Sequence, residues 1–398
     1  MLEREAMAVL VSTKGIGYGR REMALRAAGS ALALLEDPFA YTRQLSQEGA
    51  AALQKMICSG GMEKTLDVLF AAQVHLVARG EKGYPERLMH IANPPHLLFV
   101  WGREELDEPF PVAVVGTRKA TAYGLEQTRE IARDLAQAGV CVVSGLAQGI
   151  DAAAHRGALD ARGRTVAVLG GALDKFYPAA NRPLMHAILG SGGSLVSEYP
   201  LGFAPTRYSF LHRNRIIAGM SLGVLVTEGA RRSGALNTAH HALDAGREVF
   251  ALPGDVRKEG SQLPHLLISE GAHLITCAQD ILNMLTIEPP QGAKRKPEEG
   301  KAQAQDEKAR AGSEEIDEKK HEAKKALKAA AKHQAPPMPE GLGAQEAAIW
   351  QALGGGESDF DQLCETTGID AKELGALLMM MEMDGYLEAL SGLRYRLV

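Results

Sequence analysis

The stretch VAVVGTRKATAYG, residues 112–124, decides the fold of this sequence. It begins with four apolar residues that fit a buried parallel strand, turns at Gly116, and reaches Gly124, where a helix can begin. Dinucleotide-binding folds share this order but place further glycines where this chain has Arg118 and Lys119. We therefore expect a Rossmann-like strand, loop and helix, with a loop that holds an anion other than a dinucleotide.

Strand-length apolar segments recur beyond this stretch, with helical segments between them. The expected strands are PVAVVGT, GVCVVSG, TVAVLGG, GSLVSEY, LGVLVTEG and REVFALPGD, and the expected helices run near 124–138, 151–160, 181–189, 214–220 and 237–245. Apolar strands bounded by glycine and alternating with helices are typical of a parallel sheet covered on both faces. The fold class is therefore α/β, an extended Rossmann-like, doubly wound and mainly parallel sheet.

Composition divides the chain into four segments. Residues 1–80 show helical periodicity, 81–288 carry the Rossmann-like core, 289–340 are dense in Lys, Glu, Ala, Gln and Pro, and 341–398 form a C-terminal domain. The third segment has almost no large apolar residue, so we expect a disordered charged linker.

The N-terminal domain contains a glycine-rich turn. In TKGIGYGRREMALRAAG, Gly15, Gly17 and Gly19 precede a helix, as in a helix-hairpin-helix (SAM-like) unit that presents N–H groups to a phosphate. A plain helical turn that needs glycine for positive φ explains the pattern equally well.

The C-terminal segment has the winged-helix plan of three helices followed by a hairpin. Its charge opposes DNA binding, because residues 341–398 hold three basic against ten acidic side chains. The run LLMMMEM is explained either by core packing or by a soft protein-binding face. We expect a protein partner, or a vestigial domain, rather than a duplex-binding module.

Composition excludes several classes. The 398-residue chain has no apolar run near the roughly 18–20 residues of a membrane span, and its N-terminus lacks the features of a secretory signal, so we expect a cytoplasmic protein. Its four cysteines lie far apart, which predicts neither disulfides nor a zinc site. The net charge of −5 says little about nucleic acid, because binding depends on where the cations gather.

The loops that follow the expected strands gather cations, amides and small residues. They contain at least nine basic residues, more than one mononucleotide would need and suited to a polyanion. The members with a predicted anion-binding role are Gly116, Arg118, Lys119, Ser144, Gly145, Lys175, Tyr177, Arg213, Asn214, Arg215, Ser233 and Gly234.

Several of these residues have a second interpretation. Tyr177 can stack on a base or close a strand corner before a proline, and Asn214 can cap a helix that begins there. Arg231 and Arg232 are expected to face solvent. Asp151 and His155 share a helix face, where we expect a helix-start carboxylate and a core histidine rather than a metal site.

The phosphate-loop motif GxxxxGK[ST] is absent, and we expect no catalytic residue, metal or cofactor. An alternative function is a nucleotide-processing enzyme similar to Rossmann-fold phosphoribohydrolases, whose GGxGTxxE loop resembles EGARRSGALNT. The residues from Ala239 to His241 lack the glutamate that those enzymes carry on the following helix.

Together these motifs resemble the DNA-processing protein A family of bacteria (DprA, also called Smf). The matching stretches include VAVVGTRKATAYG, VVSGLAQGIDAAAHRGAL, TVAVLGGALDKFYPAANRPL, FLHRNRIIAGMSLGVLVTEGARRSGALNTAHHAL and GREVFALPGD, in family order. The resemblance implies a protein that binds single-stranded DNA without strong sequence preference, dimerises through the Rossmann core and loads a RecA-type recombinase during natural transformation. The family is not established as enzymatic.

The resemblance also assigns site residues. It places Arg118, Gly145, Lys175, Tyr177 and Arg213 in the DNA pocket and Ser233, Gly234 and Thr238 in a serine–glycine loop, and Asn181 completes the DNA-binding residues that we predict. One departure follows PGD, where the family usually has serine and then Gly-x-Asn, whereas this chain has Ser261, Leu263 and His265. That difference puts any DNA contact at this turn in doubt.

Overall fold

The computed structural model describes residues 1–287 and 343–397, with gaps in the second range at 355, 371–372, 376, 379–380, 382–385 and 391–393. The chain forms two compact units, Met1–Lys294 and Arg295–Val398, which we describe separately. The expected linker at 289–340 lies outside the described residues.

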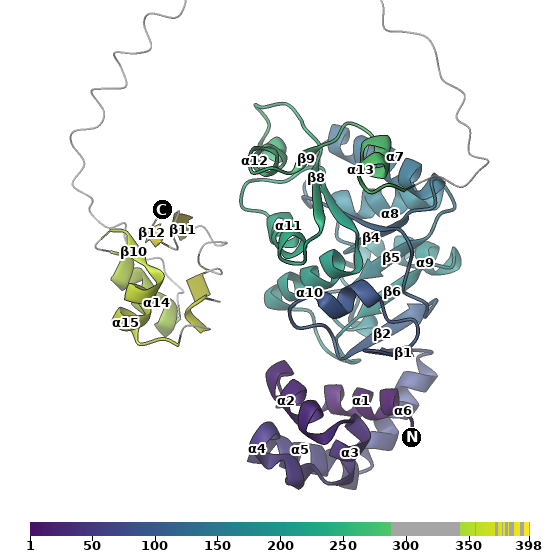
Figure 1. The fold of residues 1–398 in the computed structure, drawn as a ribbon, viewed down its shortest axis with the longest axis vertical. Helices are drawn as coiled ribbons and strands as arrows, with labels where there is room; N and C mark the ends of the chain where they lie inside the picture. The colour runs from purple at the N-terminus through teal and green to yellow at the C-terminus, as the bar shows by residue number, and fades with distance from the viewer. Residues whose placement is uncertain are drawn as a thin grey trace, which may run out of the picture. The chain divides into compact units, whose positions relative to one another are not determined.

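A nine-stranded sheet forms the centre of the first unit (Figure 1). Its strand order is β1-β2-β6-β5-β4-β3-β7-β8-β9, parallel from β6 to β9 and antiparallel at β1 and β2. The strands are β1 (His75–Ala78), β2 (Leu97–Gly102), β3 (Pro111–Val115), β4 (Cys141–Ser144), β5 (Thr165–Val168), β6 (Ser194–Ser197), β7 (Gly223–Val226), β8 (Glu248–Ala251) and β9 (His273–Leu274). The predicted doubly wound, mainly parallel fold is confirmed. β1, β2 and β9 are additional to the six expected strands, and β1 lies within the range expected to be helical.

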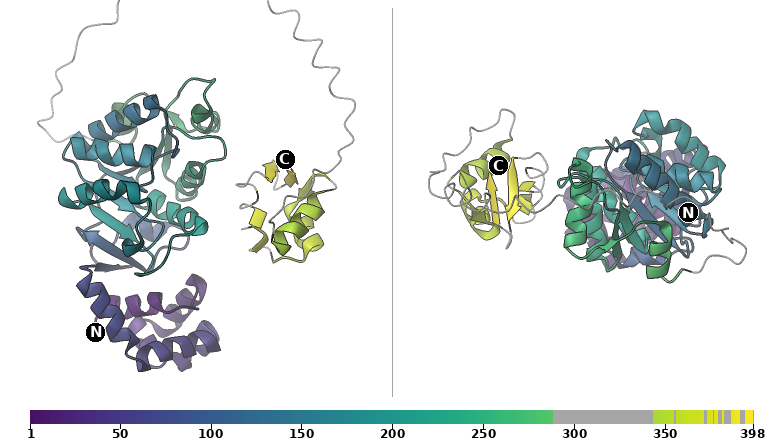
Figure 2. Two further views of the ribbon diagram at one scale, coloured as in Figure 1. Left: turned by 180° about the vertical axis from the view of Figure 1, so that it is seen from behind. Right: turned by 90° about the horizontal axis from the view of Figure 1, so that it is seen from above.

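Helices cover both faces of the sheet, as Figures 1 and 2 show. One face carries α7 (Ala122–Gln137), α8 (Ile150–Asp160), α9 (Arg182–Gly190) and α13 (Ala278–Met284), and the other carries α10 (Arg207–Met220), α11 (Gly234–Asp244) and α12 (Gln262–Ser269). Short 3-10 turns occur at Pro38–Tyr41, Glu86–His90, Leu173–Lys175, Ala179–Asn181 and Glu259–Ser261. Strands between two helical layers are buried on both sides, which explains their continuous apolar sequences.

Helix α10 begins earlier than the sequence suggested. Thr206 caps it, with its hydroxyl accepting a hydrogen bond from the Ser209 N–H at 3.1 Å. Asn214 therefore lies in the middle of the helix, and the interpretation of Asn214 as a helix cap is wrong.

The N-terminal domain is helical, as predicted. It consists of α1 (Glu3–Ser12), α2 (Tyr18–Ala28), α3 (Ala31–Glu36), α4 (Thr42–Leu45), α5 (Gln47–Cys58) and α6 (Gly61–Ala71). Gly15 has a φ of 89°, which a residue with a Cβ rarely adopts, and Gly17 is the N-cap of α2.

Glu22 of α2 links the helical domain to the sheet. Its carboxylate accepts hydrogen bonds at 2.9 Å from Arg26, from Arg79 after β1, and from the buried His96 before β2. Burial, together with the charge of Arg79, lowers the pKa of His96 to about 4, so this ring is neutral at pH 7. Burial alone would raise the pKa of Glu22, but the hydrogen bonds from both arginines lower it.

The second unit contains α14 (Ala344–Leu353), β10 (Ser358–Asp359), α15 (Phe360–Thr367), β11 (Leu387–Leu390) and β12 (Arg394–Leu397). The strands form a three-stranded sheet in the order β10-β12-β11 around a small core that includes Trp350 and Leu363. None of the helices in the described parts of either unit has the length and apolar character needed to cross a bilayer.

We predict that Glu22→Ala weakens the attachment of the helical domain. The substitution leaves the buried His96 and Arg79 without their acceptor, so we expect the free energy of unfolding to fall by about 1–3 kcal/mol. Urea unfolding followed by tryptophan fluorescence measures this. Glu36→Ala, at an exposed glutamate of the same domain, is the control, and equal losses in the two variants would contradict the role given to Glu22.

Candidate nucleic-acid interface

The loops expected to bind an anion lie at one edge of the sheet. β5, β4, β3 and β7 are parallel neighbours, so the segments that follow Val168, Ser144, Val115 and Val226 all leave the sheet at its carboxyl edge. In doubly wound folds ligands bind at this edge, at the point where the strand order reverses, which here lies between β3 and β7.

The crevice between β3 and β7 is filled by Glu228, which follows β7 and is 5% exposed. Its carboxylate accepts hydrogen bonds from the N–H of Thr121 at 2.8 Å and the hydroxyl of Thr121 at 2.5 Å. Thr121 is the N-cap of α7, so the carboxylate occupies the position beside a helix N-terminus that a bound phosphate takes in related folds.

Two glycines of the opening stretch make room for Glu228. A Cβ on Gly124 would lie 2.3 Å from the Glu228 side chain, and a Cβ on Gly116 would lie 2.6 Å from its carbonyl oxygen. The Thr117 N–H also donates to that carbonyl at 2.7 Å. Gly116 therefore allows a close contact within the protein, and its expected role in letting the backbone approach a phosphate stays a prediction.

Cations and an aromatic ring form the surface outside this crevice. Arg118, Lys119 and Lys175 are exposed, and Tyr177 is 57% exposed. The guanidinium of Arg118 lies over the ring of Phe210, 5.5 Å from its centroid, and the Tyr177 ring lies 6.0 Å from the same centroid. We call these five residues the rim surface.

A small hollow of about 30 Å³ opens within the rim surface. Its lining combines a cation, two aromatic rings and the loop after β4, namely Arg118, Gly145, Ala147, Gln148, Tyr177, Pro178 and Phe210. Three residues predicted from the sequence, Arg118, Gly145 and Tyr177, therefore meet at one place.

The buried Arg213 supports the rim surface from below. Its guanidinium donates to the carbonyls of Gly145, at 3.0 Å, and Val168, and its charge faces the buried carboxylate of Asp151. Asp151 accepts hydrogen bonds from the N–H groups of Gly145 at 3.2 Å and Ala147 at 3.4 Å. The loop after β4 is thus held from within by hydrogen bonds to two buried side chains of opposite charge.

Burial also shifts the pKa values of this pair. It lowers the pKa of Arg213 to about 10, partly opposed by Asp151, so the guanidinium remains charged at pH 7. Burial raises the pKa of Asp151, while Arg213 and the loop N–H groups act in the opposite direction.

Other predicted site residues also lie in the interior. Asn181 donates to the carbonyls of Leu146 at 2.9 Å and Ala147 at 3.1 Å, and the Ser144 hydroxyl donates to Val114 at 2.6 Å. The structure gives Asn181, Ser144, Gly145 and Arg213 contacts that shape the loop from within, and a direct contact of any of them with DNA stays a prediction.

Asn214 and Arg215 are buried and make contacts within the protein, and a direct contact of either with DNA stays a prediction. Asn214 donates to the Gly234 carbonyl at 3.2 Å and so joins α10 to α11, while Arg215 donates to Glu198 at 2.5 Å. Burial alone would raise the pKa of Glu198, but hydrogen bonds from His212 and Arg215 outweigh burial and lower it. The contacts of Arg215 are those of a buried structural ion pair.

The serine–glycine loop begins α11. Ser233 is its N-cap, Gly234 is exposed, and Thr238 is buried. The Ser233 hydroxyl is buried and has no hydrogen-bond partner within the described part of the chain. A role in DNA binding stays a prediction for these three residues.

Phe210 and Gln148 were not among the predicted site residues. Phe210 contacts both arginines of the site, since Arg213 lies 6.0 Å from its ring centroid. A signal was present, because Phe210 precedes Arg213 by three residues and therefore shares its face of α10.

The pair formed by Asp151 and His155 is structural. The His155 ring is fully buried, with Nδ1 2.7 Å from the Thr165 hydroxyl, and burial lowers its pKa to about 3. Among residues 1–287 and the described part of 343–397, no group of three or more His, Cys, Asp or Glu side chains is placed to hold a metal ion.

The segment Ser261–His265, where this sequence differs from the usual family pattern, packs inside the protein. Leu263 is fully buried, and its N–H donates to the carbonyl of Gly229, one residue after Glu228, at 2.9 Å. The turn therefore supports the backbone that carries Glu228.

Comparisons with known proteins agree with this architecture. The family model described as DNA recombination-mediator protein A matches residues 75–286, more than half of the chain, and the DprA winged helix domain matches residues 333–392. The chain belongs to the DNA processing protein A family. The resemblance seen in the sequence and the winged-helix plan are both confirmed.

Individual DprA relatives are also similar to this chain. Protein Smf of Escherichia coli is 45% identical over 224 residues, which is 56% of this chain and 60% of that protein. The X-ray structure of DprA from Streptococcus pneumoniae has 33% identity and a TM-score of 0.61, covering 71% of this chain and 98% of that chain. A structure of DprA from Helicobacter pylori, described for its single-stranded DNA binding mode, has 31% identity and a TM-score of 0.49, covering 54% and 96%.

We predict that Glu228→Ala opens an anion site that small carboxylates refill. The variant should lose about 1–3 kcal/mol of stability, because the N–H and the hydroxyl of Thr121 lose their acceptor. Sodium formate should then raise its melting temperature more than sodium chloride does at the same ionic strength.

Glu228→Gln is the matched control, because its side chain still fills the space. Wild type and this variant should respond alike to the two salts in thermal unfolding. The same response in all three proteins would contradict the role of Glu228.

We predict that stability falls as the pH drops below 6.5, in part through His155. The unfolded chain binds a proton on this histidine between pH 6.5 and about 3, whereas the folded chain does not, which removes about 2 kcal/mol by pH 5. Urea unfolding of wild type and His155→Asn at pH 7 and pH 5 tests this, and the variant should lose about 2 kcal/mol less over the interval. Equal losses would show that His155 does not contribute.

Proposed function

We propose that this chain binds single-stranded DNA without strong sequence preference on the rim surface and loads a RecA-type recombinase onto it during DNA uptake and recombination. The observation that carries the proposal is the pairing of exposed cations with an exposed tyrosine outside a crevice that Glu228 closes. A free nucleotide finds no phosphate site there, whereas a strand can lie along the outside.

The chemistry of the rim surface favours an unpaired strand. Arg118, Lys119 and Lys175 offer charge to successive phosphates, which attracts any sequence alike. The exposed ring of Tyr177 offers a stacking face, and a base stacked on protein must be free of its own stack and partner. Phe210 and Arg213 keep the platform in place.

Recombinase loading is supported by the description of the matching family, a recombination mediator. We further propose that the chain acts as a homodimer through its Rossmann-like core and that the acidic winged helix contacts protein rather than DNA. Sedimentation of the full chain, with and without residues 289–398, tests the first point and shows whether DNA binding needs the second unit.

We predict that Arg118→Ala weakens binding to oligonucleotides and lowers the salt dependence by about one phosphate contact. Tyr177→Ala should cost about 1–3 kcal/mol of binding and leave the salt slope unchanged, because stacking is uncharged. Fluorescence anisotropy with a labelled single strand across a salt series measures both quantities.

Arg129→Ala is the matched control, since Arg129 is an exposed arginine of α7 that pairs with Asp160. Its affinity and salt slope should equal those of wild type. The proposal fails if Arg118→Ala behaves like Arg129→Ala, or if nucleoside monophosphates compete with the strand. Release of free base from monophosphates by the pure protein would instead favour the enzymatic alternative.

A further inference from the structure

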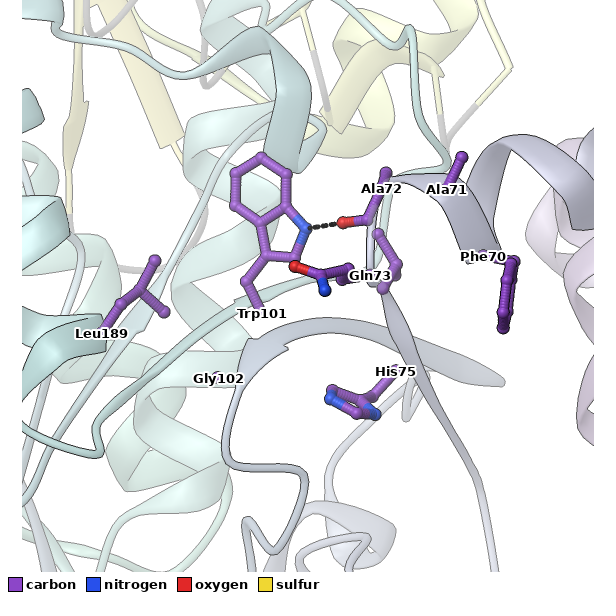
Figure 3. Close-up of a pocket in the computed structure, with 9 residues that line it drawn as sticks. Phe70, Ala71, Ala72, Gln73, His75, Trp101, Gly102 and Leu189 are labelled. Carbon is purple, nitrogen blue, oxygen red and sulfur yellow. Dashed lines mark hydrogen bonds between the residues drawn. The ribbon is translucent and has the colours of Figure 1, made fainter.

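A broad hollow lies where the end of α6 meets the edge of the sheet, far along the strand order from β3 (Figure 3). Its volume is about 1020 Å³, and its lining includes Phe70, Val74, His75, Trp101 and Leu189. The Trp101 Nε1–H donates to the Ala72 carbonyl at 2.9 Å, which fixes the indole at the wall of the hollow.

A large apolar side chain is exposed beside this hollow, because Phe70, which lines it, is 86% exposed. Single exposed apolar residues are common, but an exposed phenylalanine at the mouth of a hollow lined by tryptophan, valine and leucine forms a continuous apolar surface. Such surfaces are typical of sites that bind another molecule.

Carboxylates lie beside the apolar surface, in a second hollow. This second hollow of about 370 Å³ shares Phe70, Val74 and His75 with the first and adds Glu5, Asp67 and Glu104. Arg4, the one arginine in its lining, lies 3.9 Å from Glu81, and His75 lies 3.5 Å from Glu104. The lining of this second hollow is therefore net acidic, which disfavours binding of nucleic acid and favours a cationic partner.

The two hollows together form a groove at the amino edge of the parallel strands. The rim surface lies at the opposite, carboxyl edge. Gly102, which lines the first hollow, pairs with Ser194, the first residue of β6, whereas Arg118 lies in the loop after Val115, the last residue of the parallel strand β3. A molecule in the groove therefore leaves the carboxyl edge free for DNA.

We propose that this groove binds an exposed segment of a partner protein in which a large apolar side chain is flanked by lysines or arginines. The apolar side chain enters the hollow beside Trp101 and Phe70, and the cations meet Glu5, Asp67 and Glu104. Binding of such a segment in the groove does not depend on the proposed function. The inference that the groove holds a partner beside bound DNA rests on that function.

Trp101 provides the test, because the chain has two tryptophans and Trp350→Phe leaves Trp101 as the sole reporter. The probes are two synthetic peptides with the same central Leu-Phe-Leu, one flanked by lysines and the other by glutamates. We expect a saturable change in Trp101 emission with the lysine peptide, which weakens with salt, and none with the glutamate peptide.

Phe70→Ser and Asp67→Lys should each weaken the lysine peptide by about tenfold or more. Both residues are exposed, so the thermal unfolding of these variants should match wild type. Phe39→Ser is the control, because Phe39 is another exposed phenylalanine of the helical domain, at 51%.

Three results would overturn the inference: no saturable signal, equal binding of the two peptides, or Phe70→Ser matching Phe39→Ser. Oligonucleotide affinity is measured on the same proteins and should be unchanged in all of them. If the wild-type protein binds DNA normally but does not bind the lysine peptide, only the inference about the groove is refuted. If the wild-type protein does not bind single-stranded DNA, the proposed function is refuted.

Discussion

The carboxylate of Glu228 at the N-terminus of α7 is the contact around which the carboxyl edge of this sheet is arranged. Helix N-termini carry unpaired N–H groups and partial positive charge, and in nucleotide-binding relatives of this architecture a phosphate satisfies them. Here Thr121 receives a carboxylate from the protein itself, at 2.8 Å and 2.5 Å. Because that contact needs no ligand, the edge is complete in the free protein.

The separation of buried and exposed charge follows from this arrangement. Arg213 and Asp151 are buried against the Gly145 loop, where losing one partner would strand the other charge. Arg118, Lys119 and Lys175 lie outside, in water, where they can meet phosphates; Lys175 lies 3.9 Å from the exposed Asp174, and such a surface pair contributes little. The buried charges set the shape of the surface, and the exposed ones give it affinity.

The sequence predicts the central sheet well because its strands are buried on both faces, so that stretches such as Val112–Val115 contain only apolar residues. It did not predict β1, β2 or β9. β1 is a four-residue edge strand whose first half is accessible, β9 has two residues, and β2 pairs antiparallel to β6 and precedes the repeating pattern of strands and helices. The sequence also placed the start of α10 too late, because the segment from Thr206 to His212 has no clear apolar period.

The sequence predicted which residues belong to the candidate site, but it did not predict which of them are buried. Arg118, Gly145 and Tyr177 were named from their loops and do line one hollow. The burial of Arg213 and Arg215 could not be inferred, because their partners Gly145 and Glu198 lie elsewhere in the chain. The pairing of Glu228 with Thr121 spans 107 residues, and a single sequence carries no signal for so distant a contact.

The stacking of Arg118 on Phe210 has a consequence for the entropy of binding. A free arginine side chain on a surface samples many rotamers, and fixing them at the moment of association costs up to about 2 kcal/mol. An arginine that already rests on an aromatic ring has lost part of that freedom during folding. Part of the rotamer entropy of Arg118 is then lost during folding rather than each time a strand binds. Because the surface needs no rearrangement to receive a strand, this favours tight binding and slow release.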